Sequence, residues 1–429
     1  MMRNFLKKIF GKSTLARVST VSYQDVGKAM WTTYNIDAYL NEGYAKNPYL
    51  YAAIDLIQTA IAGIDPLVQI DDHDQLFDLP ADHPANALLA CPCEMLPSLP
   101  EWASVMCAYE ILTGSAFAVA LTRQGLGVSN GELPTALIPV SPKYIAPKPL
   151  LNAERKPVLG YIGGYEYKSG RDVYALNPQD VFWFRKHSLV NDFEGMSTVR
   201  PLERTIDTNN AAINFSKAVL DNGGFVGTVF VADNPAFGKE QAENLKSFFD
   251  ANYSGASKAG KTYWAWGGVK PYRIGATPLQ LGYDNIMQLT AREVAIVTKV
   301  PAQLLGDTNT QTYSNYQEAR EGLYTEAVIP ILTRFYNALS VYLSKIFGDK
   351  IKIKIDLDNI PALSRLRAEA RKSLREDYLA NLITRTEARR ELGFSAVDDG
   401  GEYYAENDVI TIDDGEKIWK GLLKRKNRK

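Results

Sequence analysis

The sequence predicts an α+β protein, in which short strands and turns combine with a few long helices. Three observations support this class. Prolines recur between 134 and 157 and exclude long helices there, because proline lacks a backbone donor. Segment 198–222 has apolar residues at a helical spacing, and segment 351–358 alternates apolar and charged residues as a half-buried strand does. With 429 residues, 46% of them hydrophobic, the chain can form two or three domains.

The first 44 residues mix polar and aromatic side chains without a period, so we expect a partly disordered arm. Asn47-Pro48 then predicts the start of a helix, because asparagine caps a helix and proline fits its first turn. Gly63 marks the expected end. The apolar stripe of this helix comprises Leu50, Ile54, Ile57 and Ile61.

From Pro66 to His187 we expect strands and turns. Residues 102–112 form the one helix expected there, and 181–184 a buried strand. Three aspartates, Asp71, Asp72 and Asp74, are interpreted as a solvated acidic loop.

Two helices and the segment between them follow. The first helix, Thr198 to Asn222, ends at Gly223-Gly224, and the second runs from Asn285 to Lys299. The apolar positions of the first follow a seven-residue pattern interrupted by Asn209 and Ser216. These positions are Val199, Leu202, Ile206, Ile213 and Leu220, and the second helix carries Ile286, Leu289, Ile296 and Val300.

The insert between the helices should contain strands at 225–231, 262–266 and 270–274 and a helix at 239–249. After the second helix we expect a loop from Pro301 to Thr312, then a long helix, 313–347. Pro330 should kink that helix, because it removes one backbone hydrogen bond. Charged helices are expected from 361 to 392, before the basic tail.

No catalytic or cofactor-binding pattern is present. Gly11-Lys12-Ser13 resembles the end of a phosphate-binding loop, but Leu6 stands where that pattern requires glycine. The three cysteines, Cys91, Cys93 and Cys107, are too few for a disulfide framework and leave a zinc site incomplete. The three histidines, His73, His83 and His187, fit no nucleophile–base arrangement, and His83 is interpreted as a turn residue. We therefore expect no enzyme activity, no metal and no cofactor.

The charge balance constrains the partners. With 48 basic and 49 acidic residues, the net charge is −1, whereas proteins that grip DNA without sequence preference are usually strongly basic. Any DNA contact should therefore be loose. No apolar run reaches the length of about 18 residues that a transmembrane helix needs. The basic ends could contact a membrane surface, but we interpret them as solvated or DNA-proximal tails.

Several segments, in the same order, resemble the phage portal family. They are Asn47-Pro48-Tyr49-Leu50-Tyr51-Ala52, Asp82-His83-Pro84 with Leu88-Leu89, Asp221-Asn222-Gly223-Gly224, Val300-Pro301-Ala302-Gln303-Leu304-Leu305-Gly306-Asp307 and Thr312-Tyr313-Ser314-Asn315. The resemblance covers roughly residues 45 to 395. The chain departs from the family at Ala302, where a second proline is common, and at Cys93, where asparagine is common.

The resemblance implies a portal fold assembled as a cyclic ring. Its parts would be an N-terminal arm (1–44), a wing (45–197 and 313–360), two stem helices (198–222 and 283–299), a clip (223–282), a tunnel loop (300–312) and a crown with the basic tail (361–429). A stem helix of 25 residues would span roughly 37 Å. Twelve such helices spaced ~10 Å apart would enclose a lumen of roughly 28 Å, wide enough for a DNA duplex.

The resemblance also implies a function. The chain would form a ring of about twelve subunits at one capsid vertex of the virion, assembled in the bacterial host cytoplasm. Double-stranded DNA would pass through it. Its partners would be the terminase large subunit, a head-completion adaptor, and the major capsid and scaffolding proteins, with no membrane partner.

Two sets of residues are candidates for this function. The tunnel-loop residues expected to line the DNA channel are Leu304, Leu305, Thr308, Asn309 and Thr310. The clip residues expected to dock partners are Tyr263, Trp264, Trp266 and Tyr272. In each set an alternative stays open: the leucines anchor the loop to the wing core, and the aromatic residues form the core of the insert.

Other functions remain as alternatives to a portal. Another ring-forming connector of the head–tail junction would be much smaller than this chain. An ATPase or nuclease of the packaging machinery would need a nucleotide loop or a cluster of metal-binding carboxylates, and the sequence has neither.

Overall fold

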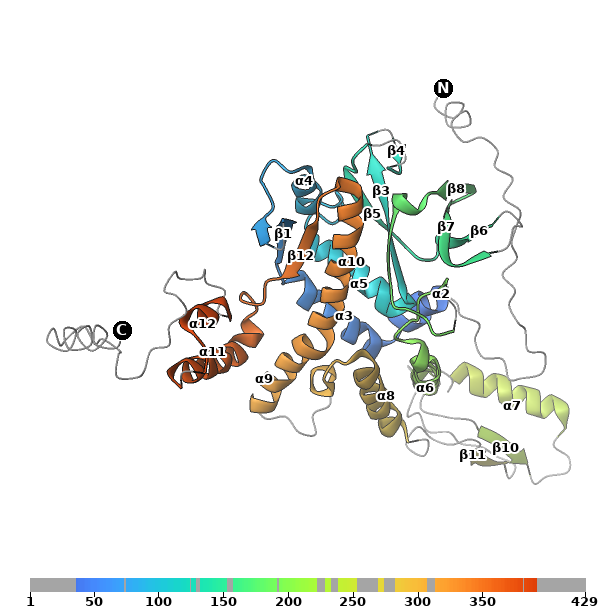
Figure 1. Ribbon diagram of the computed structural model, residues 1–429. Coiled ribbons are helices and arrows are strands. Elements are labelled where there is room, and N and C mark those ends of the chain that lie inside the picture. The colour runs from blue at the N-terminus through green and yellow to red at the C-terminus, as the bar shows by residue number, and fades with distance from the viewer. Residues whose placement is uncertain are drawn as a thin grey trace, which may run out of the picture. The chain divides into compact units, whose positions relative to one another are not determined.

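The computed structural model describes residues 36–72, 75–123, 125–128, 132–152, 157–190, 193–221, 228–232, 238–252, 269–273, 282–306, 313–380 and 382–391 (Figure 1). These residues form a mixed α+β structure, as predicted. The α-helices are α2 (Ile36–Ala38), α3 (Pro48–Ala62), α4 (Pro84–Ala90), α5 (Leu99–Thr113), α6 (Glu203–Asp221), α7 (Lys239–Asn252), α8 (Tyr283–Thr298), α9 (Tyr313–Gly322), α10 (Ile329–Phe347), α11 (Ser364–Leu379) and α12 (Arg385–Glu391).

The strands of the described residues form four small antiparallel sheets. They are β1 (Pro66–Asp72), β2 (Gln75–Asp78), β3 (Ser115–Thr122), β4 (Gly125–Leu126), β5 (Ala136–Val140), β6 (Ile145–Leu151), β7 (Pro157–Ser169), β8 (Asp172–Leu176), β9 (Val181–Arg185), β10 (Thr228–Ala232), β11 (Val269–Arg273) and β12 (Ile351–Ile355). Their orders are β12-β1-β2, β4-β3-β5 with β9 also on β3, β6-β7-β8, and β10-β11. Sheet β12-β1-β2 therefore joins the two ends of the domain, which are far apart in sequence.

Helix α3 has the predicted start and end. The Asn47 side chain accepts hydrogen bonds from the backbone N–H groups of Tyr49 and Leu50, and Gly63 caps the C-terminus. The predicted stripe is buried, together with Ala53 and Ala60. Alanines on the buried face allow α3 to approach α5 closely, and the two helices pack together.

Helix α10 packs against α5 and β9 (Figure 1). Trp102 of α5 and Phe182 of β9 are both buried, and their rings lie 5.6 and 5.8 Å from the ring of Phe335 on α10. The indole N–H of Trp102 donates to the carbonyl of Leu137, so its polar atom is satisfied. The predicted helix around Trp102 and the predicted strand at 181–184 are thus confirmed, although α5 is longer than 102–112.

The prediction of one helix between Pro66 and His187 was wrong. The short helix α4 begins at Pro84, and His83 is its N-cap: its Nδ1 accepts from the N–H of Ala85 at 3.1 Å. Its Nε2 contacts Asp349 at 3.0 Å. Histidine is an uncommon cap, so the usual cap signal was missing from the sequence.

The predicted helix from Thr198 begins later. Residues 200–202 form a 3-10 turn, and α6 starts at Glu203. The reason is tertiary: the N–H of Thr198 donates to the carbonyl of Ile111, and the Ser197 hydroxyl donates to the carbonyl of Leu112. These two hydrogen bonds to the end of α5 keep Ser197 and Thr198 from joining the helix.

The predicted long helix 313–347 contains a change of helical type rather than a simple kink. A π-helical segment, Leu323–Val328, separates α9 from α10. At its end the N–H of Ile329 donates to the carbonyl of Tyr324, five residues earlier. Pro330 follows as the second residue of α10, and it lacks the N–H that would continue the backbone hydrogen bonds to the preceding turn. The wider π turn thus accommodates the proline within one continuous helical run.

Strand β12 confirms the predicted alternation over Ile351–Ile355, because Ile351 and Ile353 are buried while Lys352 is exposed. The prediction of a solvated acidic loop was wrong at Asp71. This residue is on β1 and only 9% exposed, and the ammonium of Lys352 lies 2.6 Å from its carboxylate.

The insert between α6 and α8 contains β10, α7 and β11, in the predicted order. The predicted strand at 262–266 lies outside the described residues. The charged helices at 361–392 appear as α11 and α12, and α11 buries none of its residues.

Candidate functional site

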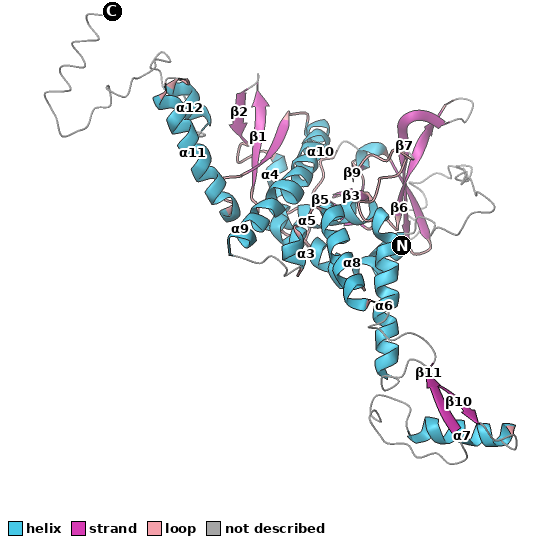
Figure 2. Ribbon diagram, turned by 90° about the horizontal axis from the view of Figure 1, so that it is seen from below, coloured by secondary structure: helices cyan, strands magenta, loops and turns pink. Residues whose placement is uncertain are grey.

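Helices α6 and α8 lie antiparallel against each other (Figure 2). Three contacts define their alignment. The Thr205 hydroxyl bonds to the Glu293 carboxylate. The Asn209 amide donates to the Met287 sulfur at 3.1 Å, and the rings of Phe215 and Tyr283 lie 6.5 Å apart.

The apolar stripe predicted for α8 was partly wrong. Leu289 is 57% and Ile296 75% exposed, whereas the buried positions are Thr290, Ala291, Val294, Ala295 and Thr298. Small side chains and β-branched residues fill this face because α8 packs closely against both α3 and α6. The two large apolar residues therefore lie on the opposite face.

A buried asparagine network joins α6 to α3. Asn47 and Asn209 are both 0% exposed, and the amide of Asn47 donates to the Asn209 side-chain oxygen at 2.9 Å. It also lies 3.2 Å from the side-chain oxygen of Asn210, whose own amide donates to the carbonyl of Glu42. Asn209 was predicted only as an interruption of the heptad pattern. The structure shows that Asn209 fixes the position of α6 on α3, because the side-chain amides of the network supply hydrogen-bond partners to one another.

The predicted loop after α8 begins with a sharp turn. Lys299 has φ 60°, Val300 is buried, and residues 302–305 form a 3-10 turn that ends at Gly306 with φ 93°. Leu305 is buried, which favours the anchoring alternative for this residue, while Leu304 is half-buried. Thr308, Asn309 and Thr310 lie outside the described residues.

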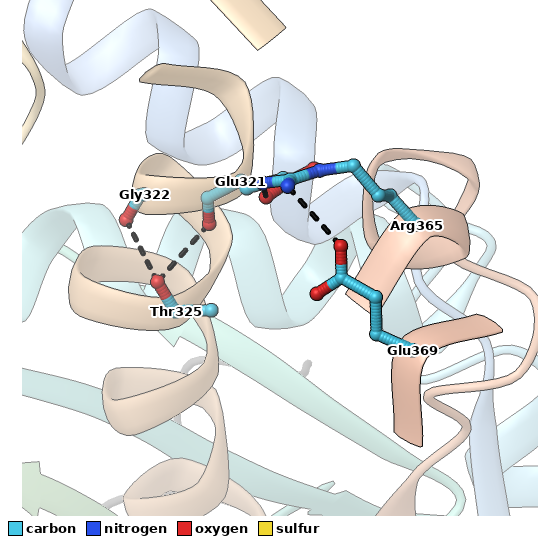
Figure 3. Close-up of polar contacts among 5 residues, drawn as sticks. All are labelled: Glu321, Gly322, Thr325, Arg365 and Glu369. Atoms are coloured by element: carbon cyan, nitrogen blue, oxygen red, sulfur yellow. Dashed lines mark hydrogen bonds and ion pairs between the residues drawn. The ribbon is translucent and has the colours of Figure 1, made fainter. Parts of the chain in front are cut away.

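A salt bridge connects α11 to α9, the helix that follows this loop in the sequence (Figure 3). The guanidinium of Arg365 contacts both carboxylate oxygens of Glu321, at 2.9 and 2.6 Å. It also reaches Glu369 at 3.3 Å. These hydrogen bonds hold the pKa of Glu321 below its usual range. Glu321 is in the last turn of α9, directly before the π segment, where the Thr325 hydroxyl donates to its backbone carbonyl.

A second acid–base pair lies inside the α5–α10 contact. Glu110 is 1% exposed, and its carboxylate meets the guanidinium of Arg334 at 2.5 Å. Burial raises the pKa of Glu110, and Arg334 opposes that rise. Burial likewise raises the pKa of the neighbouring Cys107 thiol well above its usual value. The thiol therefore stays protonated and is no nucleophile.

The described residues contain no candidate metal cluster and no candidate membrane span. No group of three histidine, cysteine, aspartate or glutamate side chains among them could hold a metal ion. All three cysteines are free; Cys93 and Cys107 are buried, and Cys91 is exposed. No helix in the described part is long and apolar enough to cross a membrane.

The aromatic residues predicted for partner docking are largely outside the described part. This holds for Tyr263, Trp264 and Trp266. Tyr272 is on β11, paired with Val229 of β10.

Comparison with known proteins identifies the family. Residues 48–393 match the family described as "Phage portal protein". The chain belongs to the phage portal protein family. It is therefore a structural, non-enzymatic protein of phage-like particles.

Two curated relatives are similar along nearly their whole length. An uncharacterized protein of Rickettsia bellii (strain RML369-C) is 26% identical over 410 residues, covering 93% of this chain and 99% of that protein. One of Rickettsia felis (strain ATCC VR-1525 / URRWXCal2) is 25% identical, with the same coverage.

Chains in several solved structures have a similar fold. A chain in the neck of an empty gene transfer agent (GTA) particle, computed with C6 symmetry, is 26% identical, with a TM-score of 0.61, and the match covers 86% of this chain and 96% of that chain. A chain in the neck of the native particle, computed with C12 symmetry, is 24% identical with a TM-score of 0.60 and the same coverage. An HK97-family phage portal protein from Corynebacterium diphtheriae matches 74% of this chain and 96% of its own, at 15% identity and a TM-score of 0.50. The portal resemblance seen in the sequence is thus confirmed.

Proposed function

We propose that this chain forms the ring-shaped DNA conduit at one vertex of the capsid of a phage or gene transfer agent. The observation that carries the proposal is the family match over 48–393, which includes the α6–α8 pair and the loop that follows it. A related chain occupies the neck of a particle computed with C12 symmetry, which supports a ring of about twelve subunits here. The ring would belong to the particle itself and assemble in the bacterial host cytoplasm.

In this proposal α6 and α8 are the stem, and the loop 300–312 is the tunnel loop. The described helices have 19 and 16 residues, so they span roughly 28 and 24 Å. This is shorter than the 37 Å expected for a stem of 25 residues. The wing would comprise 45–197 and 313–360, and the crown 361–429.

The near-neutral charge supports a conduit rather than a clamp. A net charge of −1 provides no excess of cations to bind phosphates. A duplex would therefore pass the wall without being held, on packaging and again on ejection.

The insert 223–282 would be the clip. It would dock the terminase large subunit during packaging and a head-completion adaptor afterwards, while the outside of the ring meets major capsid and scaffolding proteins. The four aromatic residues of the insert are the candidates for docking. Trp266→Ala should leave rings intact and weaken motor binding, and unchanged binding would remove Trp266 from the interface.

Native mass spectrometry and electron microscopy of the purified chain test the proposal. We expect closed rings of about twelve copies with a central hole. A chain that stays monomeric at micromolar concentration under all salt conditions would contradict it.

A further inference from the structure

The sheet β12-β1-β2 has two edges, and a helix closes the edge at β12. Just beyond β12, the N–H of Asp356 donates to the carbonyl of the residue before β1, so the odd-numbered residues of β12 point their backbone groups away from β1. The outward N–H of Ile351 donates to the Ser344 hydroxyl at 3.0 Å. That of Ile353 donates to the Ser340 hydroxyl at 2.9 Å. Helix α10 therefore takes the place of a neighbouring strand at this edge (Figure 1).

The other edge, at β2, is open. The N–H of Leu79 donates to the carbonyl of Val68 on β1 at 3.1 Å, so the backbone groups of every second residue before it face β1. Those of Leu76 and Asp78 therefore point outward, and no hydrogen bond within the described residues reaches them. The Phe77 side chain beside them is half exposed. Free donors and acceptors in a row are a template for one more strand.

The sequence around the open edge is acidic. Positions 71 to 82 contain five aspartates and neither lysine nor arginine. Asp71 pairs with Lys352 at 2.6 Å, whereas Asp78 and Asp82 are exposed. A second copy of the chain would bring the same negative charges to the edge, and like charges on paired strands repel. A basic segment is attracted to the same edge, so the charge selects the partner.

We infer that β2 binds an extended basic segment of another protein as an added strand. The backbone of the segment pairs with the outward groups of Leu76 and Asp78. Its side chains alternate between the two faces of the sheet, so basic ones lie beside Asp78 and apolar ones lie on Phe77. The site lies within one subunit and does not depend on the proposed ring.

Binding of defined peptides to the full-length protein tests the site. The probe is fluorescein-labelled Thr-Lys-Val-Lys-Val-Lys-Thr, followed by fluorescence anisotropy. We expect saturable binding of this peptide and none of the counterpart with glutamate in place of lysine.

Two N-methylated versions of the probe identify backbone pairing. Each version carries methyl groups on one of the two alternating sets of amides. Only one set faces β2 in an added strand, so one version should bind roughly tenfold more weakly or not at all, while the other binds like the probe.

Substitutions in β2 locate the site on the protein. Leu76→Pro removes an outward N–H and leaves the hydrogen bonds to β1 in place, so it should abolish binding while the circular dichroism spectrum matches that of the parent. Asp78→Asn leaves the backbone unchanged and should weaken binding several-fold, so it tests the site even where the proline disturbs the strand. Asp55→Asn, which removes an exposed charge on α3, is the matched control and should bind the probe like the parent.

Three results would overturn the site. They are a parent that shows no saturable binding, a folded Leu76→Pro variant that binds as well as the parent, and N-methylated versions that bind equally. Hydrogen exchange tests the remaining occupant, a second copy. Slow exchange of the Leu76 and Asp78 amides without peptide, lost on dilution of the protein, would show self-pairing and overturn the basic partner. The native mass of the ring is measured separately, so failure of this site leaves the proposed function standing.

Discussion

Gly114 and Gly195 lie in direct backbone contact, so close that Gly195 has no room for a side chain. A β-carbon on Gly195 would lie 1.7 Å from the carbonyl oxygen of Gly114, and one on Gly114 would lie 2.4 Å from the carbonyl carbon of Gly195. Gly114 also has φ 79° as the C-cap of α5. This contact holds the segment that leads into α6 against the end of α5, so it positions the first helix of the pair.

Gly195→Ala should therefore destabilise the protein strongly. The obstacle is backbone, which cannot rotate away as a side chain does, so we expect a loss at or above the roughly 1–3 kcal/mol typical of overpacking. Thermal or urea unfolding measures it. Gly63→Ala is the matched control: its nearest atoms would be 3.7 Å away, so its stability should stay near that of the parent. Equal stability of the two variants would show that the loop can move away.

Asn209→Ala should loosen α6 from α3. It leaves the buried amide of Asn47 with its weaker contact to Asn210, and an unsatisfied buried donor costs about 1–3 kcal/mol. Urea unfolding with the exposed Asn214→Ala as control checks this, since surface changes usually stay within about 0.5 kcal/mol. A loss no larger than that of Asn214→Ala would mean that the network contributes nothing.

The stability of an Arg334→Ala variant should depend on pH more steeply than that of the parent. Because burial raises the folded pKa of Glu110, the folded state binds its proton more tightly than the unfolded state. Ionising Glu110 thus costs stability as pH rises from the ordinary glutamate range through the folded pKa. Arg334 offsets that cost, so its loss should matter at neutral pH and much less in acid.

Urea unfolding of Arg334→Ala and of the double variant Glu110→Gln/Arg334→Ala, at neutral and acidic pH, measures the effect. The glutamine of the double variant does not ionise, so its stability should lack the extra pH dependence. A cost of Arg334→Ala that is constant with pH would show that Glu110 does not titrate in this range.

Arg365→Ala should release the start of α11 from α9. The folded pKa of Glu321 is lowered, so the pair contributes stability above the ordinary glutamate pKa and loses it as pH falls through the folded value. Arg365 is half exposed, so solvent screens the pair and keeps its contribution to stability small.

Hydrogen exchange of the α11 amides at neutral pH reports the release. Arg365→Lys should rescue it only in part, because lysine cannot make the two-point contact. Lys372→Ala, which breaks an exposed pair 3.9 Å long with Glu376, should change nothing. If the α11 amides of Arg365→Ala exchange at the same rate as those of the parent, the salt bridge does not hold α11 on α9.

Replacing Thr308, Asn309 and Thr310 with lysines should slow DNA passage. If the loop narrows the channel, twelve loops would add a ring of positive charge that holds phosphates. A packaging assay should show slower translocation that salt relieves, with rings still formed. A normal translocation rate of the triple-lysine variant at low salt would show that the loop does not line the DNA channel.

Sequence alone determined the features that depend on near neighbours. The helix start at Asn47-Pro48 was predictable because the cap bonds reach only two and three residues onward. The alternation of 351–355 predicted β12, since successive side chains of a strand face opposite sides. The order of segments around the α6–α8 pair likewise identified the family.

Tertiary structure decided what depends on residues far apart. The Gly114–Gly195 contact, the Asn47–Asn209 bond and the Arg365–Glu321 bridge join positions separated by 81, 162 and 44 residues. None leaves a local pattern, because a glycine, an asparagine or an arginine at those positions is equally compatible with a solvated surface. Leu289 and Ile296 had the spacing of a core stripe, but the side of α8 that faces the core was set by close packing of small residues against α3 and α6.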